Sequence, residues 1–213
     1  MKSIVILISG RGSNMQAIVQ AARKGNWPVR IAAIISNRAD APGLAFAEQH
    51  EVPAITVPSK DYADRNAFDC ALKQEIDRFS PDFVVLAGFM RILSAEFVVH
   101  YAGRMLNIHP SLLPSFPGLH THRQALEAGV KLHGATVHFV TAELDHGPIV
   151  AQEAVPVLPD DTEETLSARV LEVEHRLYPA AVLDAVEGRL SISNGCVLVA
   201  PKPENYLTLK ESA

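Results

Sequence analysis

The stretch Ser3–Asn14 reads SIVILISGRGSN, and it decides which fold the chain can adopt. Residues 4–8 form a continuous apolar run, which is typical of a central parallel strand buried on both faces. A turn with two glycines follows at Gly10–Asn14, and apolar residues then recur at helical spacing at Met15, Ile18, Val19 and Ala22. Strand, tight turn and helix in this order predict the first unit of a parallel α/β sheet.

The same turn is a candidate anion site. Backbone N–H groups converge at a helix N-terminus, and the helix dipole favours negative charge there. The turn lacks the final glycine of a dinucleotide fingerprint and the Lys-Ser/Thr ending of a P-loop, so a monophosphate suits it better than a triphosphate. We expect Ser13 or Asn14 to cap the helix. The alternative is an ordinary βα turn that holds no ligand.

The rest of the chain repeats the alternation of strand and helix. Apolar runs and periodicities predict strands at 30–36, 52–57, 81–87, 104–108, 134–140 and 149–157, and helices at 42–50, 59–79, 94–100, 123–128 and 161–188. Pro53 favours an edge position for the strand at 52–57, and the strand at 149–157 is expected to be antiparallel. A hairpin centred on Asn194-Gly195 is predicted at 190–198.

This order predicts an α/β fold: a single-domain, Rossmann-like, open, twisted and mostly parallel sheet with helices on both faces. The sequence shows no linker, low-complexity tract or repeat. We therefore expect one domain over residues 1–188, with a C-terminal hairpin and tail at 189–213 packed on the same domain.

Composition excludes several classes of protein. The chain has 213 residues, a hydrophobic content of 48% and a net charge of −5, which argues against binding nucleic acid or an anionic membrane. Cys70 and Cys196 lie far apart in the sequence, without the spacing of metal ligands. We therefore expect two free thiols in a reducing compartment. The N-terminal apolar run is too short for a signal peptide, and no stretch is long enough to span a membrane. We expect a cytoplasmic protein that binds small molecules and is a monomer or a weak homodimer.

The segment Asn107–His122 reads NIHPSLLPSFPGLHTH and is the candidate catalytic surface. Three prolines make it a stiff, irregular loop at the end of a buried strand, where open α/β sheets bind ligands. Asn107 and His109 alternate along an extended backbone, so both side chains can point to one side. An amide donor beside an imidazole can stabilise an oxyanion and move a proton. The alternative is a solvated histidine at a strand end.

Three further features of the sequence are weighed in the same way. Asp145 precedes Gly147-Pro148. Its side chain either helps to form a turn or orients a charged His109. A metal site at His120 and His122 is disfavoured, because no His-x-x-x-His lies on a helix and neither cysteine has a partner at ligand spacing. His138 is expected to be an interior or wall histidine. The apolar run Phe89–Leu93 suits a flat heteroaromatic ligand, or simple core packing.

Taken together, four motifs resemble a known family. They are SGRGSN at 9–14, LAGFMRIL at 86–93, NIHPSLLP at 107–114, and HFV followed by LDHGP at 138–148. They are similar to those of the folate-dependent formyltransferases. The N-terminal Gly-x-Gly-Ser-Asn and the later Glu174-His175-x-x-Tyr178-Pro179 narrow the resemblance to the phosphoribosylglycinamide formyltransferase (glycinamide ribonucleotide transformylase) family of purine biosynthesis. The similarity extends from the first strand to about Pro179.

The resemblance implies roles for individual residues. The catalytic group is Asn107, His109 and Asp145. The ribonucleotide site is Gly12, Ser13 and Asn14 for the phosphate, with Glu174 for the amine. The folate site comprises Arg65, Met90, Arg91, Ile92, Leu93, Asn107, Thr141, Ala142, Glu143, Leu144 and Asp145. The implied co-substrate is 10-formyltetrahydrofolate, and no metal is implied.

The implied reaction is transfer of the formyl group to the amine of glycinamide ribonucleotide, with Asn107 and protonated His109 stabilising a tetrahedral intermediate. Two other classes stay open. One is a related formyl-folate enzyme, either a formyltetrahydrofolate hydrolase or a methionyl-tRNA formyltransferase, both of which typically carry a further domain. The other is a non-catalytic module that binds a phosphorylated ligand through Gly10–Asn14.

Overall fold

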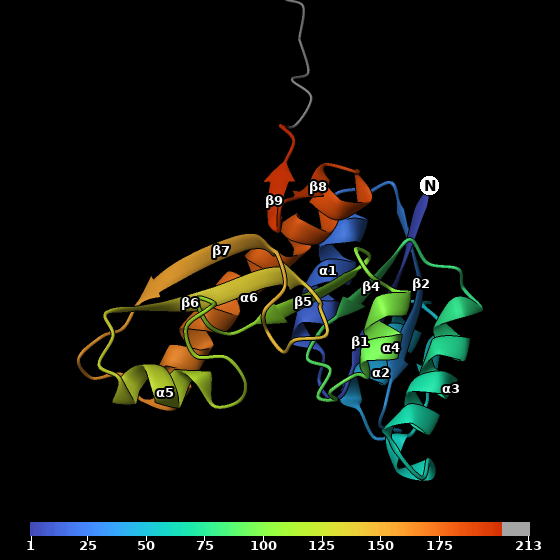
Figure 1. The fold of residues 1–213 in the computed structure, drawn as a ribbon, viewed down its shortest axis with the longest axis horizontal. Helices are drawn as coiled ribbons and strands as arrows, with labels where there is room; N and C mark the ends of the chain where they lie inside the picture. The colour runs from blue at the N-terminus through green and yellow to red at the C-terminus, as the bar shows by residue number, and fades with distance from the viewer. Residues whose placement is uncertain (202–213) are drawn as a thin grey trace, which may run out of the picture.

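The computed structural model describes residues 1–201, and its centre is a seven-stranded sheet in the order β3-β2-β1-β4-β5-β6-β7 (Figure 1). The strands from β3 to β5 run parallel, and β6 and β7 are antiparallel to their neighbours. Their bounds are β1 Lys2–Ile8, β2 Val29–Ser36, β3 Ala54–Thr56, β4 Phe83–Leu86, β5 Met105–His109, β6 Leu132–Phe139 and β7 Ile149–Pro156.

Helices cover both faces of the sheet. They are α1 Ser13–Lys24, α2 Pro42–Gln49, α3 Arg65–Asp77, α4 Ala95–His100, α5 Thr121–Glu127 and α6 Glu163–Val186, with a 3-10 turn at Ser59–Asp61. Figure 1 shows α3 and α4 on one side of the parallel strands and α1 and α6 on the other.

The alternation of side chains along β1 supplies both cores. Ile4, Ile6 and Ile8 pack with α1 and α6, whereas Val5 and Leu7 pack with α3 and α4. A strand buried on both faces must be apolar throughout, which is why residues 4–8 are. The predicted single-domain, Rossmann-like, mostly parallel sheet with helices on both faces is confirmed.

The connections set where a site can form. From β1 the chain moves outward through β2 to β3, and it then returns to β4 on the other side of β1. The order of the strands therefore reverses between β1 and β4, and the loops at their carboxyl ends diverge there. In open α/β sheets ligands bind in the crevice at such a point. The loops after β1, β4 and β5 all open toward it.

Several predicted boundaries were wrong. The helix predicted at 59–79 begins only at Arg65, after the 3-10 turn, with the Asp64 side chain capping it through the N–H of Ala67. Neither Ser13 nor Asn14 caps α1, because Gly12 is the N-cap and has a positive φ of 66°. The helix predicted at 161–188 begins only at Glu163, because Thr162 is its cap. The edge position of β3, the antiparallel β7 and the hairpin are confirmed.

The hairpin consists of β8 Leu190–Ser193 and β9 Cys196–Val199. Leu190 and Val197 pack against the core that contains α1 and α6. The hairpin therefore lies on the same domain, while the predicted tail from 202 to 213 falls outside the described residues. Within residues 1–201, no helix is both long enough and apolar enough to cross a bilayer.

Candidate active site

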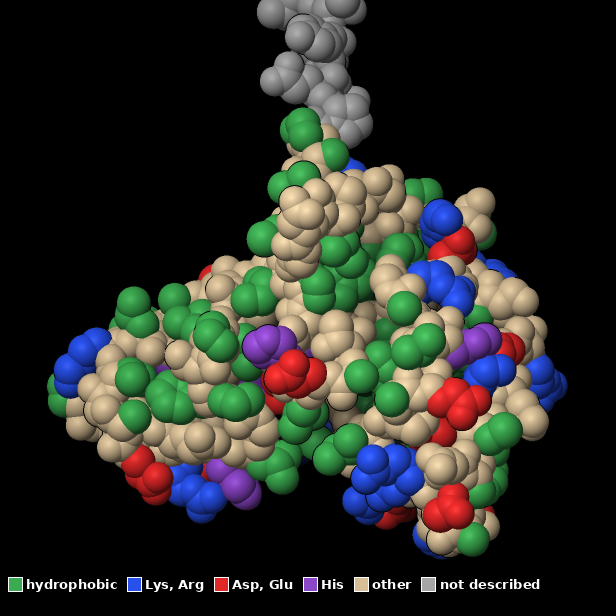
Figure 2. Space-filling view, viewed as in Figure 1, with side chains coloured by type: hydrophobic (Ala, Val, Ile, Leu, Met, Phe, Trp, Pro, Cys, Tyr) green, Lys and Arg blue, Asp and Glu red, His purple; other side chains and the backbone are tan. Residues whose placement is uncertain are grey.

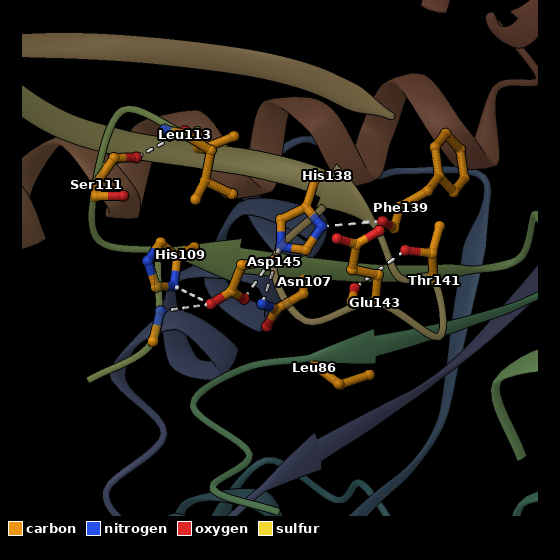
Figure 3. Close-up of polar contacts among 12 residues, drawn as sticks. Leu86, Asn107, His109, Ser111, Leu113, His138, Phe139, Thr141, Glu143 and Asp145 are labelled. Carbon is orange, nitrogen blue, oxygen red and sulfur yellow. Dashed lines mark hydrogen bonds and ion pairs between the residues drawn. The ribbon is translucent and has the colours of Figure 1, made fainter. Parts of the chain in front are cut away.

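His109, the last residue of β5, is buried and faces two acceptors, one of which is the Asp145 carboxylate drawn beside it in Figure 3. Its Nε2 lies 3.0 Å from the carbonyl oxygen of Phe116, and its Nδ1 lies 3.5 Å from Oδ2 of Asp145. A neutral imidazole has only one N–H, whereas both nitrogens of an imidazolium donate. The surroundings of His109 therefore suit the charged ring.

Asp145 is held in place by the loops around it. Its Oδ2 accepts the backbone N–H of Gly118 at 2.9 Å, and its side chain is only 7% exposed. The residue has a φ of 52°, an uncommon conformation for a residue other than glycine. Such backbone strain persists only where the surroundings enforce it. The segment 141–148 and the loop after β5 thus meet at one carboxylate.

Asn107 is oriented by His138, which lies directly opposite on β6. The Nδ1 of His138 lies 2.9 Å from the carbonyl oxygen of Phe139, so this nitrogen carries the proton and donates it. Nε2 is then an acceptor, and it lies 3.2 Å from Nδ2 of Asn107. Burial lowers the pKa of His138, which keeps the ring neutral and in this role.

This contact fixes which way the Asn107 amide faces. One N–H of Nδ2 points to His138, and the second stays available to a ligand. Sequence reasoning placed His138 correctly as a buried histidine and missed its contact with Asn107. Only the register of β5 against β6 reveals the pairing, since the two residues lie 31 positions apart.

The loop after His109 is tied to β6 and β7. Oγ1 of Thr136 donates to the carbonyl of Ser111 at 2.6 Å and accepts the N–H of Leu113 at 3.0 Å. Gln152 donates from β7 to both Oγ1 of Thr136 and the carbonyl of Leu113, at 2.8 Å each. The proline-rich loop is therefore rigid both through its prolines and through these bonds.

The first βα turn and α6 form a second polar group. No side chain caps the first turn of α1, because its N-cap is Gly12, so the first N–H groups of the helix have no capping partner. Nδ2 of Asn14 donates to Oε2 of Glu174 at 2.7 Å, and both residues are buried. Oδ1 of Asn14 has no hydrogen-bond partner among the described residues. Burial raises the pKa of Glu174, and its bond from Asn14 opposes that rise.

Glu174 is held beside Asn14 because α6 is anchored one turn later, at Tyr178. The hydroxyl of the fully buried Tyr178 donates to the carbonyls of Leu86 and Leu106, at 2.9 and 3.0 Å. These carbonyls lie at the end of β4 and within β5, beside Asn107. The same helix turn therefore joins Asn14 and Glu174 to the strands that carry Asn107 and His109.

Apart from Asn107 on β5, the predicted folate residues lie on the loops after β4 and β6 and at the start of α3. Met90 and Ile92 are 72% and 60% exposed on the loop after β4, and Leu144 is 58% exposed on the segment 141–148. Arg65 is exposed at the start of α3. Figure 2 shows a notch between the part that carries α5, β6 and β7 and the part that carries α3, with hydrophobic side chains on both walls.

The structure thus places His109 beside Asp145, Asn107 beside His138 and Asn14 beside Glu174. The catalytic and binding roles of these residues, and of the 90–93 and 141–144 segments, stay predictions. Within residues 1–201, no group of three or more His, Cys, Asp or Glu side chains is arranged to hold a metal ion. His122 instead pairs with the buried His133, at 3.2 Å between ring nitrogens.

Comparison with known proteins decides the family. The sequence profile of the formyl transferase family matches residues 2–182, which is most of the chain. The chain belongs to the formyl transferase family. Membership extends over every element from β1 to most of α6, and so over both polar groups described above.

Members of the formyl transferase family are similar to this chain along nearly its full length. The phosphoribosylglycinamide formyltransferase of Escherichia coli (strain K12) is 53% identical over 190 residues, covering 89% of this chain and 90% of that protein. The crystal structure of glycinamide ribonucleotide transformylase 1 from Symbiobacterium toebii superimposes with a TM-score of 0.91 at 49% identity, covering 94% of this chain and 95% of that one.

A formyltetrahydrofolate deformylase from Pseudomonas syringae has the same fold. It superimposes with a TM-score of 0.88 at 30% identity, and the match covers 94% of this chain but 66% of that one. The fold alone therefore does not separate transfer of a formyl group from its hydrolysis, and the acceptor site has to be argued from the residues.

Proposed function

We propose that the protein transfers the formyl group of 10-formyltetrahydrofolate to the amine of glycinamide ribonucleotide, a step of purine biosynthesis. One observation carries this proposal: Asn107, His109 and Asp145 meet at the carboxyl end of β5, next to the crevice at which the order of strands reverses. Donors fixed in this way can stabilise negative charge that develops in a transition state.

The neutral amine of the ribonucleotide attacks the formyl carbon on N10 of the folate. A carbon–nitrogen bond forms, and the carbonyl oxygen becomes an oxyanion. The free N–H of Asn107 donates to it, and the positive charge of the His109 imidazolium, whose two N–H groups face Phe116 and Asp145, stabilises it electrostatically. A proton moves from the amine nitrogen to N10, through His109 or water. The bond from carbon to N10 then breaks, and tetrahydrofolate leaves.

The acceptor is recognised at the other polar group. Its phosphate binds the amides at the start of α1, with Gly12, Ser13 and Asn14 around it. Glu174 accepts from the amine, and the unpartnered Oδ1 of Asn14 accepts a further hydrogen bond from the bound ribonucleotide. This site separates a transferase from a hydrolase, because hydrolysis needs water at the formyl carbon and no amine.

The folate lies against the segments after β4 and β6. Met90, Arg91, Ile92 and Leu93 supply apolar walls and backbone groups on one side of the pterin, and residues 141–145 supply the other. Arg65 lies farther out, where a positive charge suits the carboxylates of the folate tail. We further propose a cytoplasmic enzyme of small molecules that is a monomer or a weak homodimer.

The test is to mix the protein with 10-formyltetrahydrofolate and follow the appearance of tetrahydrofolate by absorbance, with and without glycinamide ribonucleotide. We expect product only when the ribonucleotide is present. Product in its absence would instead establish hydrolysis. No product in either case would overturn the proposal and favour a binding module, which equilibrium titration with the ribonucleotide would then test.

A further inference from the structure

The segment Phe89–Ser94, here called the β4 loop, has no regular secondary structure, yet it presents two large apolar side chains to the crevice. Phe89 is buried at its start, while Met90 and Ile92 point outward and are mostly exposed. An irregular loop with exposed apolar groups adopts many conformations unless its backbone is held. The β4 loop therefore needs contacts with the rest of the fold to keep one conformation that a ligand can bind.

Its first anchor is Ser9, the residue between β1 and the glycine turn. The buried Oγ of Ser9 accepts the backbone N–H of Met90 at 2.7 Å and donates its own proton to Oδ1 of Asn37 at 2.6 Å. Because the buried Asn37 accepts the hydrogen bond from the Ser9 hydroxyl, the lone pairs of Oγ are free to accept the N–H of Met90. A backbone bond from the N–H of Ser9 to the carbonyl of Gly88, at 3.2 Å, reinforces this junction.

Its second anchor is Asp69, on α3. This carboxylate is 3% exposed, and its Oδ2 accepts the backbone N–H of Ser94 at 2.6 Å. Between the two anchors, the guanidinium of Arg91 lies 5.7 Å above the ring of Phe68, the neighbour of Asp69 on α3. Among residues 1–201, Met90 and Ser94 are the amides of the β4 loop that hydrogen-bond to side chains elsewhere in the fold.

We infer that Ser9 and Asp69 are positioning residues for the folate co-substrate, which fix the β4 loop at its two ends so that Met90 and Ile92 stand ready to receive the pterin. This rests on the proposed function, because the loop is assigned there to the folate. Neither residue touches the ligand. They act by removing conformational freedom that binding would otherwise have to remove.

The anchors also connect the two substrate sites. Ser9 directly precedes the turn that binds the ribonucleotide phosphate, so one hydroxyl fixes the end of β1 against the β4 loop. Asp69 lies one helical turn after Arg65 on α3. The folate wall is therefore set by β1 on one side and α3 on the other.

The experiment compares four variants with the wild-type chain. Ser9→Ala and Asp69→Ala each remove one acceptor. Asp69→Asn keeps an oxygen that can accept from Ser94. Ser36→Ala is the matched control, because Ser36 is a buried serine whose Oγ accepts a backbone N–H, that of Arg38 at 3.1 Å, away from the β4 loop. The readouts are the Kd of tetrahydrofolate by calorimetry, the KM of each substrate, and hydrogen exchange at the Met90 and Ser94 amides.

We expect Ser9→Ala and Asp69→Ala to raise the Kd of tetrahydrofolate roughly 3- to 10-fold, the factor that one net hydrogen bond contributes. The KM for the ribonucleotide should change less than twofold, and the amide beside each removed acceptor should exchange faster. Asp69→Asn should restore most of the affinity. Ser36→Ala should lower the urea midpoint by an amount similar to Ser9→Ala and leave the Kd unchanged.

Two results would overturn the inference. One is an unchanged Kd for tetrahydrofolate in Ser9→Ala, even if Asp69→Ala fails to fold. The other is an equal weakening of both substrates, or an equal effect of Ser36→Ala, either of which assigns a general structural role. If the wild-type chain binds no tetrahydrofolate and transfers no formyl group, the proposed function itself fails, and the inference falls with it.

Discussion

At the scale of single residues, the site is built so that each donor has a fixed direction. His109 has an acceptor at each ring nitrogen, the carbonyl of Phe116 and the carboxylate of Asp145. Asn107 is turned by the neutral His138 so that one N–H is left for a ligand. Donors arranged in advance need no reorganisation when charge develops, and this is why such donors accelerate acyl transfer.

Asn107→Ala and His109→Ala should each lower kcat by about 100- to 1000-fold, the effect of removing one oxyanion donor. Both variants should still fold, because neither side chain fills a large part of the core. Steady-state kinetics with both substrates, together with circular dichroism, checks this. Near-normal turnover in either variant would remove that residue from the mechanism.

Asp145→Asn should lower kcat while changing the KM of either substrate less than twofold. A carboxylate stabilises positive charge on the ring next to it, whereas a neutral amide does not. The Asn side chain can still accept from Gly118 and so keeps the local structure. Steady-state kinetics with both substrates measures the change, and an unaltered kcat would show that Asp145 only shapes the loop.

At the scale of elements, α6 is the helix that positions Glu174 and Tyr178, and its start is well defined. Oγ1 of Thr162 accepts the N–H of Thr165, and Oγ1 of Thr165 accepts the N–H of Thr162, which completes a capping box. Asp161 instead forms an ion pair with Arg169, with 2.7 Å between Oδ2 of Asp161 and Nη1 of Arg169. The sequence indicates a cap in this region, but Asp161 and Thr162 are both good caps, and only the backbone decides between them.

Thr162→Ala should lower the free energy of unfolding by about 1 kcal/mol, the usual contribution of a helix N-cap. Urea denaturation followed by circular dichroism measures it. Asp160→Ala, a change two residues earlier and outside the capping box, is the control and should have a smaller effect. Turnover per folded molecule should be unchanged, because Thr162 lies three helical turns from Glu174. An equal loss in both variants would mean that the box contributes nothing of its own.

The helix starts show where prediction from sequence fails at this scale. Ser13 and Asn14 are good cap residues, yet Gly12 occupies the N-cap because the chain must enter α1 with a positive φ. A Cβ at position 12 would lie 3.0 Å from Cε of Met15 and 3.3 Å from Cγ2 of Ile8. The predicted anion site therefore depends on the absence of a side chain at position 12, a requirement that local helix propensity does not express.

At the scale of the whole molecule, what the sequence predicted was local and what it missed was distant. The alternation of strands and helices along the chain, the strand buried on both faces and the loop after Asn107 follow from apolar runs and prolines within a few residues of each other. The roles of His138, Ser9 and Asp69 depend on register and on contacts over 25 or more positions. Nothing nearby in the sequence marks them, because each has the pattern of an ordinary buried or helical residue.

Buried histidines give the whole molecule a sensitivity to acid. His133 is 1% exposed, and burial, with the nearby His122, lowers its pKa to about 4. Burial also lowers the pKa of His122 and of His138. Between pH 6.5 and about 4 the unfolded chain binds a proton at position 133 that the folded chain does not bind. The free energy of unfolding must therefore fall as pH falls through this window.

For His133 the slope is about 1.4 kcal/mol per pH unit within the window, with no contribution above pH 6.5, where both states are neutral. Glu174, whose pKa is raised, acts in the opposite sense, because its folded form takes up a proton before its unfolded form does. Urea unfolding at pH 7.5, 6.0 and 5.0 should show the decline in the free energy of unfolding. His133→Gln should reduce the slope of this decline by about 1.4 kcal/mol per pH unit, the contribution of one proton. His146→Gln, at an exposed histidine, is the matched control and should leave the slope unchanged. A slope that His133→Gln does not alter would show that position 133 binds its proton equally in the folded and unfolded chains, and would contradict the lowered pKa of His133.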